Sequence, residues 1–204
     1  QAFAYLANSF PKVVVFATPG NHGRNTVRHP QRAVNQKWDC FESVIYHSIK
    51  VALRDIPNIE IVIPKTPYYI WTAFDQKGMG THGDSVLKPG FPGRSINVDS
   101  VRKQISEFNS SRQQGDRCKL FLVGHVHTGS IVHLPNGTTF ISNGCLVQSD
   151  HYGLSVGLFA TSTGQYLWES VPGRIMGDSR FITVSESDRN DESLEKIIKP
   201  FTDF

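Results

Sequence analysis

Two apolar runs in this chain each end in a glycine and then in polar residues that commonly bind metals. Lys12–Thr18 (KVVVFAT) is followed by Pro19-Gly20-Asn21-His22, and Lys119–Val123 (KLFLV) is followed by Gly124-His125-Val126-His127. Short β-branched or aliphatic runs of this kind are typical of buried strands of an α/β sheet. Because binding crevices of such sheets lie at the carboxyl ends of the strands, we expect both polar segments at one edge of the fold.

A further histidine has the same setting. Met79-Gly80 leads into Thr81-His82-Gly83-Asp84, another junction between a predicted strand and a loop. Neutral imidazole and amide oxygen are ligands of divalent metals, so the three segments together predict a metal site. In Gly124-His125-Val126-His127 we expect an extended backbone that points alternate imidazoles the same way, with the glycine allowing the turn.

The rest of the chain shows a mixed pattern of helices and strands and no linker between domains. We therefore predict one α/β domain over residues 1–204, with a β-rich second half and a loosely ordered acidic tail from about 185. The predicted helices are Gln1–Phe10, Asp39–Leu53 with Asp39 as N-cap, and Val98–Ser110. Further predicted strands are Ile59–Ile63, Tyr68–Ala73, a hairpin of Ser130–Leu134 with Thr138–Ser142, and a hairpin of Leu154–Ala160 with Gln165–Glu169.

Composition narrows the class of protein further. Of 204 residues 39% are hydrophobic and 19% charged, which excludes global disorder, and a net charge of +3 is too small to argue for nucleic-acid binding. Three distant cysteines, with no paired framework, favour a reducing compartment. No stretch is long and apolar enough to span a membrane, so we expect a cytoplasmic protein, cellular or virus-encoded.

The ordered series GNH, a lone histidine and GHxH resembles the calcineurin-like metallophosphoesterase family. That family's pattern is DxH, GDxxD, GNH followed by an acid, a histidine and GHxH, and the resemblance here extends from about Val13 to Gly144. It implies a two-sheet β-sandwich flanked by helices, of αββα type, present here as its C-terminal two-thirds.

The resemblance also implies roles for individual residues. Asn21, His82 and His125 would bind one divalent ion, and His127 would bind a second. His22 would contact the phosphate and protonate the leaving oxygen. Separately from the resemblance, Arg24 follows this segment in the sequence, and its guanidinium can bind a substrate phosphate. The implied cofactors are two divalent ions, Mn²⁺ foremost, with Fe, Zn²⁺ and Ni²⁺ as alternatives.

Two departures from the family pattern stand out. Gly23 occupies the place of the acid after GNH, and the DxH and GDxxD motifs are absent from this chain. Two dications held by neutral imidazoles would repel each other, so a bridging carboxylate is required. We therefore expect the missing acidic ligands on an upstream segment or on a second chain, as a split gene of the kind found in phage genomes would produce.

The resulting prediction is a metal-dependent phosphoester hydrolase, foremost a phosphodiesterase or nuclease, with phosphoproteins and nucleotides also open as substrates. One alternative is a non-catalytic scaffold or binding subunit that retains the fold. Another is a mononuclear metal-binding module that uses Asn21, His82 and His125. Less strongly indicated contacts to substrate or to the rim of the site are Arg28, Arg94, His151 and Tyr152.

Overall fold

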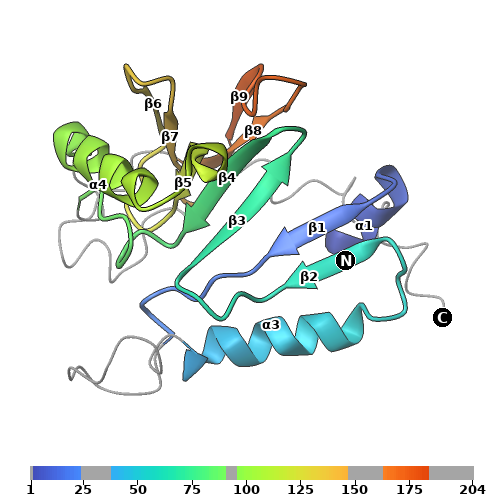
Figure 1. Cartoon of the computed structure of the whole chain (residues 1–204). Coiled ribbons are helices and arrows are strands. Elements are labelled where there is room, and N and C mark those ends of the chain that lie inside the picture. Colours follow the sequence, from blue (N-terminus) through green and yellow to red (C-terminus); the bar gives the residue numbers. More distant parts are fainter. Residues whose placement is uncertain (1, 24–37, 91–95, 147–162, 184–204) are drawn as a thin grey trace.

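The computed structural model describes residues 2–23, 38–90, 96–146 and 163–183 (Figure 1). The predicted α/β class is confirmed: within these ranges the strands form one five-stranded and two two-stranded sheets, accompanied by helices. The acidic tail predicted from about residue 185 lies outside the described residues. No helix in the described ranges has the length and apolar character needed to cross a membrane.

The N-terminal part is a β-α-β unit preceded by a short helix. Helix α1 spans Ala2–Ser9, strand β1 Val13–Phe16, helix α3 Phe41–Ala52 and strand β2 Ile59–Val62. Strands β1 and β2 pair in parallel, from Val13 opposite Ile59 to Phe16 opposite Val62. Parallel strands need a crossover connection, and α3 belongs to it and lies beneath the pair in Figure 1.

Helix α3 does not begin as predicted. Cys40, rather than Asp39, occupies the N-cap position, and its side chain makes no capping hydrogen bond. Instead the backbone N–H of Phe41 donates to the carbonyl oxygen of Gly23 at 2.8 Å. A contact from a loop distant in sequence thus satisfies a helix-terminal N–H, and this ties the start of α3 to the loop that carries Asn21.

The five-stranded sheet contains β3 (Tyr68–Ala73), β4 (Gln76–Thr81), β5 (Cys118–Val123), β6 (Ser130–His133) and β7 (Thr139–Ser142). Its order is β3-β4-β5-β7-β6, with β4, β5 and β7 parallel and β3 and β6 antiparallel at the edges. Strands β4 and β5 end level, because Thr81 pairs with Val123. The predicted β6–β7 hairpin is confirmed, and its turn includes Gly137 at φ 75°.

The sequence predicted β3 and a strand end at Met79-Gly80, but neither the bounds of β4 nor its pairing with β3, because β4 carries two glycines in place of a strand-like apolar pattern. A Cβ on Gly78 would lie 2.1 Å from the Trp71 ring, and a Cβ on Gly80 would lie 2.2 Å from the Tyr69 ring. The aromatic side chains of β3 therefore lie directly over the glycines of β4. In a strand, glycine often marks such a close approach.

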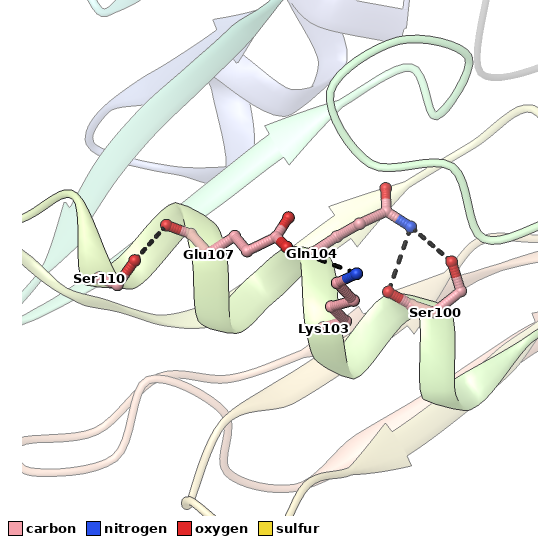
Figure 2. A network of polar contacts seen from close by, with 5 residues as sticks. All are labelled: Ser100, Lys103, Gln104, Glu107 and Ser110. Carbon is pink, nitrogen blue, oxygen red and sulfur yellow. Dashed lines mark hydrogen bonds and ion pairs between the residues drawn. The ribbon is translucent and has the colours of Figure 1, made fainter.

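Helix α4 covers one face of this sheet. It spans Val98–Ser110, as predicted, and the Asn97 side chain caps it by accepting a hydrogen bond from the Ser100 N–H at 2.9 Å. Val101 and Ile105 are buried in the core with Phe121. The opposite face is polar (Figure 2), where Gln104 Nε2 donates to Ser100 Oγ, and Lys103 and Glu107 form an ion pair. The helix is thus amphipathic in the manner of a helix packed on a sheet.

The C-terminal hairpin includes a strand that was not predicted. Strand β8 (Gly164–Trp168) pairs antiparallel with β9 (Ser179–Thr183), a later segment that was not predicted as a strand. The segment 154–160, which was expected to pair with β8, lies outside the described residues. The Asn143 side chain links this hairpin to the end of β7, because its Oδ1 accepts from the Tyr166 N–H at 2.9 Å.

An aromatic stack joins the β1–β2 pair to the five-stranded sheet. The rings of Phe16 in β1 and Tyr69 in β3 are nearly parallel, with centroids 4.6 Å apart. Burial raises the pKa of the Tyr69 phenol above its ordinary value, so this side chain stays neutral at physiological pH. Because Tyr69 also covers Gly80, the stack depends on the glycine beneath it.

We expect Gly80→Ala to lower the free energy of unfolding by about 1–3 kcal/mol, because the added methyl group displaces the Tyr69 ring. Gly115→Ala is the control, since a Cβ there meets nothing within 4 Å, and it should change stability by less than about 0.5 kcal/mol. Urea denaturation measures both. Equal effects of the two substitutions would contradict the packing described for Tyr69.

Candidate functional site

The ends of β4 and β5 bring two of the predicted histidines together. The backbone N–H of Gly124 donates to the carbonyl oxygen of His82 at 3.0 Å, which extends the contact between the strands by one step. The rings of His82 and His125 pack edge to face, with centroids 5.0 Å apart and an interplanar angle of 64°. The parallel register of two neighbouring strands therefore sets the distance between these imidazoles.

The loop after β1 brings Asn21 to the same place. Its Oδ1 lies 2.9 Å from His82 Nε2, and in the absence of a metal the protonated nitrogen would donate to the amide oxygen. Two donor atoms about 2.1 Å from one ion and at roughly a right angle to each other are about 3 Å apart. The pair thus has both the atom types and the spacing of two adjacent ligands of one divalent ion.

The GHVH segment has a different conformation from the one predicted. His125 and His127 both have φ 61°, in the left-handed region, so the backbone is not the extended one that would point alternate side chains the same way. Val126 between them is fully buried, and its N–H donates to the Gly124 carbonyl oxygen at 2.6 Å. Burial of Val126 holds a backbone conformation that non-glycine residues adopt rarely, and such conformations cluster at functional sites.

Glycines lie where these loops meet. Gly83 has φ 112°, and a Cβ there would lie 3.2 Å from the Cβ of His125 and 3.3 Å from that of Val123. A Cβ on Gly20 would lie 3.3 Å from Cε1 of His82. The loops that carry the predicted ligands are therefore packed directly against one another.

The remaining predicted residues fall into two groups. His22 and His127 are exposed and lie beside Asn21 and His125 on the same two loops. Arg24 lies outside the described residues, as do Arg28, Arg94, His151 and Tyr152. The structure thus brings together Asn21, His82 and His125, and the roles assigned to these and to His22, His127 and Arg24 stay predictions.

The converging side chains have atom types that bind divalent ions, but among the described residues too few of them converge to hold one. Across residues 2–23, 38–90, 96–146 and 163–183, no three or more His, Cys, Asp or Glu side chains converge closely enough to hold a metal. The converging groups are two imidazoles and one amide, all of which are neutral as ligands. A dication held by these groups alone keeps its full charge uncompensated, so the structure agrees with the need for carboxylates inferred from the sequence.

A cavity of about 500 Å³ opens beside this cluster. Its wall combines the end of β1 with side chains from α3 and β3, and it reaches His82 and Gly124. Tyr46 is part of the wall, and its hydroxyl donates to the Thr18 carbonyl oxygen at 3.4 Å. Burial, followed by the negative charge of Glu42, raises the pKa of the Tyr46 phenol, so the phenol stays neutral.

Sequence reasoning missed one acidic side chain near the site. Glu42, in the first turn of α3, accepts a hydrogen bond from the Gly23 N–H through Oε1 at 3.0 Å. The signal available was an acid at the start of the first predicted helix after the Asn21 loop. This acid was not predicted to belong to the site, because nothing in the sequence indicates that this helix packs against that loop.

Comparison with known proteins finds similarity only at the level of structure. No family model matches the chain, and no curated protein matches its sequence. A Vps29 double mutant from Entamoeba histolytica is 12% identical with a TM-score of 0.36, and the match covers 71% of this chain. This chain spans 63% of the length of that Vps29.

Two further solved structures are similar to the same degree. The hypothetical protein PH1004 from Pyrococcus horikoshii OT3 is 11% identical with a TM-score of 0.45, over 96% of this chain and 72% of that one. A conserved uncharacterised protein from Streptococcus pneumoniae TIGR4, described as a predicted phosphoesterase, is 12% identical with a TM-score of 0.33, over 84% of this chain and 95% of that one. At these identities the similarity concerns the fold and transfers no activity.

The contact between Gly83 and His125 can be tested with a pair of alanine substitutions. Gly83→Ala and Gly137→Ala both place a side chain at positive φ, and each should cost about 1 kcal/mol or more of stability. Only Gly83→Ala adds an atom against His125, so we expect it alone to shift the His125 ring signals in NMR spectra. Unchanged His125 signals in folded Gly83→Ala would contradict the packing of the two loops.

Proposed function

We propose that this chain carries the histidine-bearing part of the active site of a metal-dependent phosphoester hydrolase. The observation that supports it is the convergence of Asn21, His82 and His125 from three strand ends, with Asn21 Oδ1 at 2.9 Å from His82 Nε2. Imidazole and amide oxygen are ligands of divalent metals, and the proposed ion is Mn²⁺ foremost, with Fe, Zn²⁺ and Ni²⁺ as alternatives. A bound divalent ion supplies Lewis-acid neutralisation of the charge on the phosphoryl oxygens.

In this proposal the chain's own residues bind the metal ions, bind the substrate phosphate and donate a proton to the leaving group. His82 and His125, fixed by the β4–β5 register, would hold one ion together with Asn21, and His127 would hold a second. His22 is exposed beside Asn21, where its imidazole can donate a proton to the leaving oxygen of the substrate. Arg24 follows on the same segment and binds the phosphate through its guanidinium.

The carboxylates come from polypeptide outside this chain's described residues, either an upstream segment or a second chain. Two observations support this part of the proposal. The converging donors are neutral, and within the described residues β1 pairs on one side only, with β2. The cavity of about 500 Å³ beside β1 reaches His82, so a strand docked there would bring acids next to the imidazoles.

A phosphodiester, including one in nucleic acid, is the proposed substrate class. Arg24 and Arg28 follow Asn21 and His22 in the sequence, and guanidinium groups can meet a phosphodiester anion with paired hydrogen bonds. Phosphoproteins and nucleotides are the competing substrates, and a parallel assay separates them.

A second candidate function is a non-catalytic binding subunit. It is favoured by the absence, among the described residues, of a cluster of three or more acidic, cysteine or histidine ligands. It is also favoured by the exposed apolar side chains Phe41, Val44, Ile45 and Val51 along α3. Apolar side chains gathered on one helix are a feature of protein interaction surfaces.

The metal and activity experiment uses the chain together with its upstream segment or partner. We expect about two metals by mass spectrometry and Mn²⁺-dependent hydrolysis of bis-p-nitrophenyl phosphate and oligonucleotides, with phosphopeptides turned over more slowly. His82→Ala or His125→Ala should reduce metal affinity and turnover about tenfold or more. His133→Ala is the control, since that exposed histidine contacts Thr139 on the far hairpin.

Turnover of phosphopeptides alone would overturn the phosphodiesterase proposal. Absence of metal in the completed protein would overturn the hydrolase proposal and support the binding subunit.

The origin of the carboxylates gives a separate prediction. The isolated chain should bind Mn²⁺ weakly, and addition of the upstream segment or partner should tighten binding because it brings negative charge to neutral ligands. Calorimetry with Mn²⁺ measures both states. Equal affinity with and without the added polypeptide would show that this chain already holds its full ligand set.

A further inference from the structure

The carboxylate of Glu42 lies against the loop that presents Asn21 and His22, although it belongs to helix α3. Its Oε1 accepts the Gly23 N–H at 3.0 Å, and Phe41, the residue before it, donates its own N–H to the Gly23 carbonyl oxygen at 2.8 Å. Both polar groups of the Gly23 backbone are therefore bound by the first turn of α3. Two hydrogen bonds to α3, one to the N–H and one to the carbonyl group of Gly23, therefore fix the end of the loop.

The space at Gly23 is already taken by this carboxylate. A Cβ on Gly23 would lie 1.7 Å from Oε2 of Glu42 and 2.2 Å from its Cδ. A Cβ on Gly20 would lie 3.6 Å from Oε1 of Glu42 and also 3.6 Å from Nε2 of His82. Glycine at 20 and 23 thus lets the acid approach the loop backbone closely, on the side where the loop meets His82.

The second oxygen of Glu42 is in an unusual environment. Oε2 is buried, and it has no hydrogen bond by the usual geometric criteria among the described residues. Burial and a hydrogen bond to the Glu42 carboxylate raise the pKa of the Cys40 thiol, so this thiol also contacts the carboxylate. A buried carboxylate with only the Gly23 amide and a weak thiol donor as partners costs free energy, so such a group usually serves a purpose beyond local packing. Nothing in the metal-ligand arrangement proposed above uses it.

We propose that Glu42 is a positioning residue that fixes the loop 20–23 through the Gly23 amide and so holds the Asn21 amide oxygen against His82 Nε2. This inference rests on the proposed function in one respect, namely that the Asn21–His82 pair binds a metal ion. A carboxylate is well suited to this task, because hydrogen bonds to an ionised acceptor are roughly twice as strong as neutral ones. The acid that binds this loop therefore comes from helix α3 and contacts the Gly23 backbone.

The decisive experiment is NMR of the metal-free full chain, which requires no activity. The Asn21 side-chain amide and the His82 ring report the contact between these two residues. Glu42→Ala and Gly23→Ala should both shift these signals, the first by removing the acceptor and the second by displacing it. Glu42→Gln keeps an oxygen acceptor and should leave the signals closer to those of the original chain.

The matched control is Glu60→Gln, because Glu60 is an exposed acid of β2 whose partner is Lys12. It should leave the Asn21 and His82 signals unchanged. A double substitution, Glu42→Ala with Gly23→Ala, should shift the signals no further than either change alone, since both act on one contact. Asn21 and His82 signals that stay unchanged in Glu42→Ala would overturn the proposal, as would full additivity.

Mn²⁺ affinity is the second readout. Glu42→Ala should raise the dissociation constant about tenfold, as loss of a group that orients a metal ligand commonly does, and Glu42→Gln should recover part of it. If the original chain binds no Mn²⁺ even when completed, the hydrolase proposal fails while the NMR comparison still decides the role of Glu42. If Glu42→Ala does not fold, Gly23→Ala and Glu42→Gln carry the same comparison.

Discussion

The parallel pairing of β4 with β5 is the constraint on which the candidate site depends. Thr81 and Val123 lie opposite each other as the last residues of their strands, and the Gly124 N–H continues the contact to the His82 carbonyl oxygen. A shift of register by one residue would turn each side chain to the other face of the sheet and separate His82 from His125. The buried residues of both strands fix that register, because a slip would move Phe121 and Met79 out of the core cluster in which they pack together.

The third donor reaches the site by a different route. Asn21 follows β1, which belongs to the separate β1–β2 pair, so its position depends on how that pair packs against the larger sheet. The Phe16–Tyr69 stack makes that connection through aromatic packing. The contact of Glu42 with Gly23 then fixes the Asn21 loop against α3 through a partly buried hydrogen bond. The site is therefore composite, and its geometry is only as well defined as these two contacts.

Much of the local structure could be predicted from the sequence. The helix Val98–Ser110 and the Asn-Gly hairpin follow from apolar periodicity and turn chemistry, which act within a few residues. The predictions for Asp39 and for the extended GHxH segment were wrong, and the pairing of β9 with β8 was not predicted. At the start of α3 a hydrogen bond to Gly23, distant in sequence, decided the outcome, and β9 is a later segment of the chain than β8. Between the two histidines Val126 is fully buried.

The sequence by itself determined the α/β class and the candidate donors Asn21, His82 and His125, because apolar runs that end in glycine place polar residues at strand ends. The tertiary structure alone decided that Asn21 and His82, 61 residues apart, lie within 2.9 Å of each other. It alone placed Glu42 beneath their loop and gave His125 its left-handed backbone. The physical reason is that periodicity specifies which face of an element is buried, whereas distances between elements come from strand register and side-chain packing between segments far apart in the chain.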